Sequence, residues 1–274
     1  ADLTLSGTTT NVEPGQTVTV TFGGKNYTAS VASDGSWTAT LPAADLTALP
    51  EGSASAQASV SNINGNSASA VHNYSVDSSA PTIIINTVAS DNIVNASEAD
   101  AGVTVSGSTT AEAGQIVTVT LNSPTVQTYQ ATVQADGSWS INIPAADLEA
   151  LTDGSHTLTA TVNDKAGNPA STTHNLAVDL TVPVLTINTI AGDDIINAAE
   201  HGQALVISGS STGGEAGDVV TVTLNSKTYT TTLDASGNWS VGVPAADVTA
   251  LGSGPQTITA TITDIAGNSD DASR

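Results

Sequence analysis

The sequence Asp136-Gly137-Ser138-Trp139, followed by Ile143-Pro144-Ala145-Ala146-Asp147-Leu148, decides the fold because this chain contains it three times. An earlier copy reads Asp34-Gly35-Ser36-Trp37 with Leu41-Pro42-Ala43-Ala44-Asp45-Leu46. A looser later copy reads Ser236-Gly237-Asn238-Trp239 with Val243-Pro244-Ala245-Ala246-Asp247-Val248. The recurrence, about every 100 residues in a chain of 274, predicts three similar domains in tandem.

Apolar and hydroxyl side chains alternate along the segments between these recurring motifs. Val117, Val119 and Leu121 alternate with Thr118 and Thr120, and the other two copies repeat the pattern. A period of two is typical of half-buried strands, and the Asp-Gly and Ala-Gly-Asn sequences between them are turn formers. In the second copy the pattern predicts about seven strands, at 82–88, 102–107, 115–122, 128–134, 138–143, 155–163 and 171–178. The predicted class is therefore all-β, with tandem Ig-like β-sandwich domains in an elongated array.

The predicted domains are 1–77, 78–179 and 180–274, which we name the first, second and third repeats. The segment 3–7 near the start of the first repeat matches 103–107, the second predicted strand of the second repeat, so the N-terminal strand of the first repeat is expected to be missing. The third repeat ends soon after 264–268, so its last strand is expected to be truncated. Both linkers read Asp-x-x-x-Pro, at 77–81 and 179–183, which favours a stiff connection over a free coil.

Several recurring residues are interpreted as structural. The segment 144–151 predicts one or two helical turns, because proline suits the first turn and an acidic residue suits the positive end of a helix. The aspartates of this segment and the recurring tryptophans are expected to support the fold: Asp45, Asp147, Asp247, Trp37, Trp139 and Trp239. His72 and His174 are expected to be exposed on the last strand of their repeats.

Charge and composition exclude several classes of partner. The formal net charge is −22, from 26 acidic and 4 basic residues, so nucleic acid and anionic membrane surfaces are poor partners. No cysteine is present, which excludes disulfides and zinc–thiolate sites and is compatible with export from a bacterium. No apolar run is long enough to span a membrane. Divalent cations are the natural partner of such a chain, although acidity could also serve solubility alone.

The acidic residues concentrate where the repeats should meet. In a seven-strand sandwich alternate loops lie at opposite ends, so Asp164 should face Asp77 and Asp264 should face Asp179. Carboxylates that converge without a partner repel each other, increasingly so as water is excluded. Calcium resolves this repulsion, because it accepts six to eight oxygen ligands in loose geometry. These four aspartates are therefore the first candidate calcium ligands.

Five further acidic residues lie in the loop after the first strand of the second and third repeats, and are weaker candidates: Asp91, Asp193, Asp194, Glu98 and Glu200. The alternative interpretation is that all these residues only form turns, because Asp and Asn are common turn-forming residues. Asn62 replaces the aspartate in the first repeat, so any site upstream of it should hold calcium weakly or not at all.

The motifs as a set resemble a known family. They are Asp-Gly-Ser-Trp, Pro-Ala-Ala-Asp-Leu, Asp-Lys-Ala-Gly-Asn, Val-Asp-x-x-x-Pro and Asp-Asn-Ile-Val-Asn-Ala-x-Glu, and the resemblance extends over the whole chain. The chain looks like the bacterial Ig-like repeats of giant type I-secreted, non-fimbrial adhesins, with an enterobacterial giant adhesin as the expected nearest relative, and is also similar to biofilm-associated proteins. The resemblance implies long extracellular rods that bind calcium near domain junctions and carry an adhesive tip.

The sequence therefore predicts a calcium-rigidified, non-catalytic segment of a secreted adhesin at the bacterial cell surface. Expected partners are calcium, neighbouring repeats of the same chain and a host-cell glycan or surface receptor, with a monomeric state and no membrane insertion. A carbohydrate- or protein-binding module of the adhesin tip and a metal-free spacer remain as alternatives. No nucleophile elbow, phosphate loop or paired-histidine motif points to an enzyme.

Overall fold

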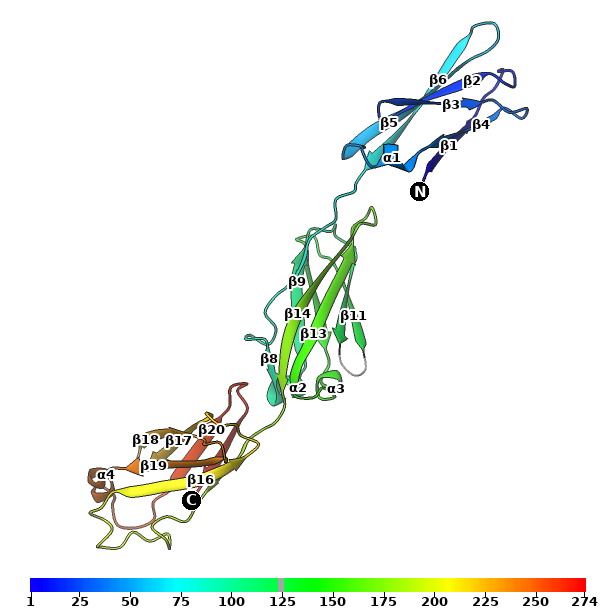
Figure 1. The fold of residues 1–274 in the computed structure, drawn as a ribbon. Coiled ribbons are helices and arrows are strands. Elements are labelled where there is room, and N and C mark those ends of the chain that lie inside the picture. Colours follow the sequence, from blue (N-terminus) through cyan, green and yellow to red (C-terminus); the bar gives the residue numbers. More distant parts are fainter. Residues whose placement is uncertain (123–125) are drawn as a thin grey trace. The chain divides into compact units, whose positions relative to one another are not determined.

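The computed structural model describes residues 1–122 and 126–274, and the chain divides into two compact units, Ala1–Ser79 and Ala80–Arg274 (Figure 1). Each unit is built mainly from antiparallel strand pairs, as the alternating apolar and hydroxyl residues predict, and the second unit adds one short parallel pairing. The strands carry buried apolar side chains on one face and exposed Thr or Ser on the other. The all-β, tandem Ig-like class is confirmed.

The first unit consists of one repeat. Its elements are β1 (Leu3–Thr8), β2 (Thr17–Phe22), β3 (Lys25–Ser30), β4 (Ser36–Leu41), α1 (Ala43–Leu46), β5 (Gly52–Ser61) and β6 (Ser67–Val76). One sheet has the order β3-β2-β5-β6, and the other consists of β1 and β4 alone. Its core cluster includes Val18, Val20 and Leu41, while Trp37 is only half-buried.

The second unit contains two further core clusters, one in each of the second and third repeats. Its elements in the second repeat are β7 (Ile83–Ile85), β8 (Ile93–Asn95), α2 (Ala96–Ala101), β9 (Val103–Thr109), β10 (Ile116–Asn122), β11 (Gln127–Thr132), β12 (Ser138–Ile143), α3 (Ala145–Leu148), β13 (Gly154–Asn163) and β14 (Pro169–Asp179). Two sheets face each other, with the orders β11-β10-β13-β14-β8 and β12-β9-β7.

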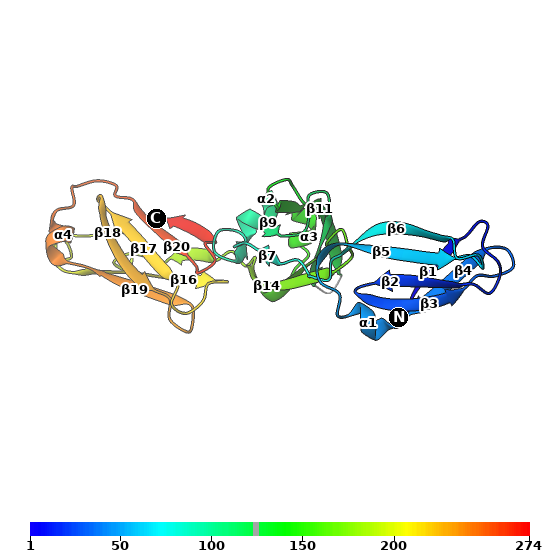
Figure 2. The ribbon, with the colours of Figure 1, turned by 90° about the horizontal axis from the view of Figure 1, so that it is seen from above.

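The third repeat follows the same plan. Its elements are β15 (Val184–Ile187), β16 (Leu205–Thr212), β17 (Val219–Leu224), β18 (Lys227–Thr232), β19 (Asn238–Val243), α4 (Ala245–Thr249), β20 (Ile258–Thr263) and β21 (Ser269–Ser273). The sheets have the orders β15-β16-β19 and β18-β17-β20-β21, and Figure 2 shows β18, β17 and β20 side by side.

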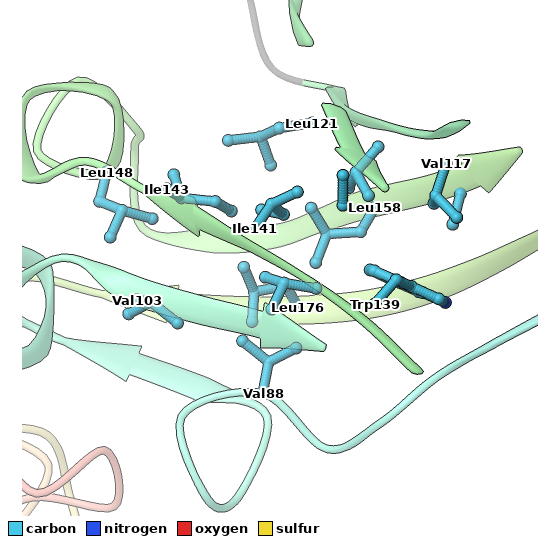
Figure 3. Close-up of a cluster of buried hydrophobic side chains, with 14 of the residues drawn as sticks. Val88, Val103, Val117, Leu121, Trp139, Ile141, Ile143, Leu148, Leu158 and Leu176 are labelled. Carbon is cyan, nitrogen blue, oxygen red and sulfur yellow. The ribbon is translucent and has the colours of Figure 1, made fainter. Parts of the chain in front are cut away.

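The core of the second repeat lies between its two sheets. Figure 3 shows Leu121, Leu158 and Leu176 from one sheet gathered with Ile141 and Trp139 from the other. Trp139 is 2% exposed, which confirms its interpretation as a core residue. Full burial of each such aliphatic side chain stabilises the fold by about 1.5–3 kcal/mol, so each repeat has a core of its own to sustain it.

Glycine allows the first strand of the second repeat to close the sandwich. A Cβ atom added at Gly107 would lie 2.0 Å from the carbonyl oxygen of Ile84 and 2.4 Å from the ring of Trp139. At Gly209, its counterpart in the third repeat, the carbonyl oxygen of Thr186 would lie at 1.9 Å. Because the strand that follows each linker packs this closely, it anchors the linker to its repeat.

The predicted order of strands was wrong at one segment of the second repeat. Residues 91–100 were expected to form a loop, but the structure places a short strand, β8, and a helix, α2, within it. Strand β8 pairs parallel to the end of β14, with Val178 opposite Val94. A strand of three residues is too short for its alternation to be read from sequence. The loop that joins β7 to the rest of the repeat is therefore an ordered part of it.

Candidate junction between the second and third repeats

The linker after β14 is fixed to the second repeat by a carboxylate. Asp153, in the turn before β13, accepts hydrogen bonds from the backbone nitrogen of Leu180 (2.7 Å) and the hydroxyl of Thr181 (2.5 Å). These bonds hold the pKa of Asp153 below its usual value. The first repeat has a counterpart in Glu51, which accepts a 3.0 Å bond from the backbone nitrogen of Ser78. An acidic residue thus orders the start of each linker.

The loop 264–268 of the third repeat is a closed turn. The Asp264 carboxylate accepts bonds from the backbone nitrogen of Asn268 (2.8 Å) and from its side-chain amide (2.9 Å). Asn268 is 5% exposed and Ala266 is 3% exposed, whereas Ile265 between Asp264 and Ala266 is 89% exposed. The loop therefore buries an amide and a methyl group while it leaves a large apolar side chain in solvent.

This loop contacts the second repeat directly. The side-chain amide of Asn268 donates to the carbonyl oxygen of Asp179 at 3.0 Å and accepts from the backbone nitrogen of Ala96 at 2.8 Å. In return, the side-chain amide of Asn95 donates to the carbonyl oxygen of Ala266 at 3.0 Å. The loop after the first strand of the second repeat does face the third repeat, as the alternation of loop ends predicts.

Negative charge accumulates at the same junction. Burial raises the pKa of Asp179, the hydrogen bond from the Thr181 backbone nitrogen opposes part of that rise, and the carboxylates of Asp264, Asp153 and Glu215 each add a smaller rise. The structure thus brings Asp179 and Asp264 together. In the described part of the chain the ion pairs are Lys25–Asp45, Lys227–Asp247 and Arg274–Asp194, so none of them neutralises Asp179 or Asp264.

The chemistry of these groups fits calcium better than a transition metal. Every candidate ligand is an oxygen, from carboxylates or from backbone carbonyls, and the site carries excess negative charge. The groups are not assembled into a coordination shell: across residues 1–122 and 126–274, no three His, Asp or Glu side chains converge closely enough to hold a metal ion. The oxygens of Asp264 and Asp153 are instead occupied by the hydrogen bonds described above.

The other predicted ligands have local partners. Asp91 and Asp193 accept bonds from the backbone nitrogens two residues later, at 2.9 and 3.0 Å. Glu98 and Glu200 accept from the backbone nitrogens of Asn95 and Asn197, as the third helical residue does in a capping box. These four side chains therefore order the loop that carries α2 and its counterpart in the third repeat.

Asp194 is held by the last residue of the chain. Arg274 donates to both of its carboxylate oxygens at 2.6 Å, which lowers the pKa of Asp194 to about 2. In the second repeat the equivalent positions are His174 and Asn92, whose Nε2 and Oδ1 atoms lie 2.7 Å apart. His174, interpreted as an exposed strand residue, is thus half-buried and hydrogen-bonded. A guanidinium–carboxylate pair in the third repeat thus replaces a histidine–asparagine pair in the second.

The remaining predicted pair cannot be treated as one site. Asp77 lies in the first unit and accepts a 3.2 Å bond from the backbone nitrogen of Ser79. Asp164 lies in the second unit, and the side-chain amide of Asn168 donates to it at 2.8 Å, which lowers the pKa of Asp164. Both stay candidates on sequence grounds.

Comparison with protein families identifies the fold. Residues 79–180 and 205–274, more than half of the chain, match the model of the bacterial Ig-like domain. The chain belongs to the bacterial Ig-like domain family. No functionally curated protein matches it significantly. In the described part of the chain, no helix is long and apolar enough to cross a membrane.

Among solved structures, three are similar to the chain at 31–36% sequence identity. A Ca2+-stabilized adhesin with which an Antarctic bacterium binds ice is 36% identical, and the alignment covers 99% of this chain and 67% of the adhesin chain, with a TM-score of 0.47. A bacterial ice-binding adhesin described for host cell surface retention is 35% identical, covering 99% and 88%, with a TM-score of 0.47. A tetra-tandem repeat from the extending region of a large adhesion protein is 31% identical, covering 98% and 68%, with a TM-score of 0.35. The expected kinship with one enterobacterial adhesin is not shown.

Proposed function

We propose that this chain is a non-catalytic, extracellular segment of a large bacterial surface adhesin, and that calcium at the repeat junctions restricts the angle between neighbouring repeats. Membership of the bacterial Ig-like domain family and the three tandem copies support the structural role. The domain boundaries that we propose are 1–77, 78–179 and 180–274. We propose further that the chain is secreted, works as a monomer and displays a distant adhesive domain toward a host glycan or receptor.

The observation that carries the calcium proposal is the uncompensated charge at Asp179. The half-buried carboxylate of Asp179 lies in the electrostatic field of Asp264, Asp153 and Glu215, and none of the basic residues in the described ion pairs is paired with it. Calcium, when bound, supplies the positive charge that lets these groups stay ionised at short distance. Asp179 comes from the second repeat and Asp264 from the third, so a shared ion would couple the two.

The remaining aspartates are proposed ligands of lower rank. We propose Asp77 and Asp164 as further calcium ligands, and the loop residues Asp91, Asp193, Asp194, Glu98 and Glu200 could complete a shell only by giving up their present hydrogen bonds. Extracellular modules bind calcium at about 0.1–1 mM. At millimolar calcium, a site of roughly 0.1 mM affinity would add on the order of 1.4 kcal/mol per junction.

Small-angle scattering with and without a calcium chelator tests the proposal. Calcium should increase the maximum dimension and sharpen the distance distribution of the full chain, and magnesium should have a smaller effect because it requires stricter octahedral geometry. A scattering profile that calcium leaves unchanged would favour the metal-free spacer. Glycan-array binding by the chain would show instead that these repeats adhere themselves.

A further inference from the structure

We propose that Asn268 is the residue that fixes the junction between the second and third repeats, through an amide lock that needs no metal ion. The lock consists of Asn268 and Ala266 on the third repeat and of Asn95, Ala96 and Asp179 on the second. Its bonds form without a metal ion, although it shares Asp179 and Asp264 with the proposed calcium site.

The hydrogen-bonding partners of Asn268 require a side chain with one acceptor and two donors, and asparagine is the residue of this size that provides them. The backbone nitrogen of Ala96 can only donate, so it needs an acceptor at 2.8 Å. The carbonyl oxygen of Asp179 and the carboxylate of Asp264 can only accept, so each needs a donor, at 3.0 and 2.9 Å. A primary amide has one acceptor oxygen and two N–H donors, which matches this set. Aspartate has no donor, serine has one, and glutamine is longer by a methylene group.

Burial indicates that these bonds, and not apolar contact, orient the loop. Asn268 and Ala266 are almost inaccessible while Ile265 is 89% exposed. Hydrophobic burial alone would favour the opposite arrangement, because a buried isoleucine contributes more than a buried alanine and a buried amide must keep its partners. The loop has therefore turned its polar residue toward the second repeat.

The bonds run in both directions across the junction. Asn268 of the third repeat hydrogen-bonds to two backbone groups of the second repeat. Asn95 of the second repeat donates to the carbonyl oxygen of Ala266 in the third. Backbone groups at both ends of the contact are thus satisfied by side chains of the other repeat. Three directional bonds between different pairs of atoms restrict the angle between the repeats more than a single bond can. Only repeats with Asn at the last position of this loop can form the full set.

The internal repeats provide a matched control. Asn168 occupies the position of Asn268 in the second repeat and makes the same bonds within its own loop, from its backbone nitrogen and its amide to Asp164 at 2.8 Å each. Substitution of Asn168 removes the same local contact as substitution of Asn268. It should leave the junction between the second and third repeats unchanged.

The experiment is a distance measurement between two spin labels in the full chain, with a calcium chelator present throughout. The chain has no cysteine, so exposed threonines at equivalent positions, Thr132 and Thr232, can be labelled as Thr132→Cys and Thr232→Cys. The parent should give a narrow distribution. Asn268→Ala should broaden it and make the Ala96 amide exchange roughly tenfold faster, the effect of one lost hydrogen bond. Asn168→Ala should change neither.

A second variant guards against simple unfolding of the third repeat. Asn95→Ala removes a donor from the other side of the junction, so it should broaden the same distribution while the thermal unfolding of the third repeat stays unchanged. If Asn268→Ala and Asn95→Ala both leave the distribution as narrow as in the parent, the lock does not set the angle and the proposal is wrong. Because calcium is absent, that result would not bear on the calcium site.

Discussion

Replacing Gly107 by alanine tests whether the strand after each linker closes its repeat as the structure shows. The new Cβ atom would lie 2.0 Å from the carbonyl oxygen of Ile84 and 2.4 Å from the ring of Trp139. Neither neighbour can move freely, because one is backbone and the other is 2% exposed. Strand β7 must therefore detach or shift.

The cost follows from what β7 and the residues after it bury. Ile83 is 7% exposed and Val88 is fully buried. If both side chains return to water at about 1.5–3 kcal/mol each, Gly107→Ala destabilises the second repeat by about 3–6 kcal/mol. That is a large fraction of the 5–15 kcal/mol that is typical of a whole domain. Gly7 occupies the same position in the first repeat, but the three atoms nearest to its added Cβ all belong to the side chain of Trp37 and none is backbone.

Hydrogen exchange followed by mass spectrometry is the assay, because it resolves the two repeats in one sample. Gly107→Ala should expose the Asn86 amide, which bonds to the carbonyl oxygen of Ser106 at 2.8 Å. Gly7→Ala should cost far less, about 1 kcal/mol for a displaced and half-buried ring. Equal effects of the two substitutions would refute the reasoning, because they would mean that β7 does not pack over Gly107.

Two further predictions concern charge. Asp179→Asn should raise the thermal stability of the chain in chelator, because it removes a charge that burial and Asp264 disfavour. It should also abolish the additional stabilisation by calcium. Equal destabilisation in chelator and in calcium would contradict this prediction. Arg274 depresses the pKa of Asp194 from 3.8 to about 2, so the stability that this pair contributes should be complete above about pH 4 and lost as the pH falls toward 2. Urea unfolding of the parent and of Asp194→Asn should therefore converge near pH 2, and a difference that persists there would show that the pair acts through something other than ionisation.

Sequence reasoning predicted most of the fold because its patterns are local. The alternation around Val117 and Val119 gave the strands, and the Asp-Gly turns and the Pro-Ala-Ala-Asp segments gave their connections. Strand β8 escaped prediction because its pairing partner, the end of β14, lies more than 80 residues away in sequence. Helix α2 did leave a signal, since Asn95 and Glu98 have the spacing of a capping box.

The candidate site was predicted in part. Loop alternation was enough to bring Asp264 near Asp179. It could not show that Asp153 and Glu215 add to the same negative field, because they come from other loops. It also missed Asn268, whose role depends on partners in another repeat. The recurrence of Ala-Gly-Asn at 166–168 and 266–268 was the available signal, but turn chemistry explains the same letters. Only the buried contacts of Asn268 with Ala96 and Asp179 distinguish a role at the junction from simple turn formation.

A crystal structure of the chain grown at saturating calcium tests the central claim most directly. The account predicts one ion between the second and third repeats, coordinated by carboxylate oxygens of both Asp179 and Asp264 at about 2.3–2.6 Å, with the remaining ligands from carbonyl groups and water. The account is contradicted if those two carboxylates point apart into solvent under that condition and no ion lies between them.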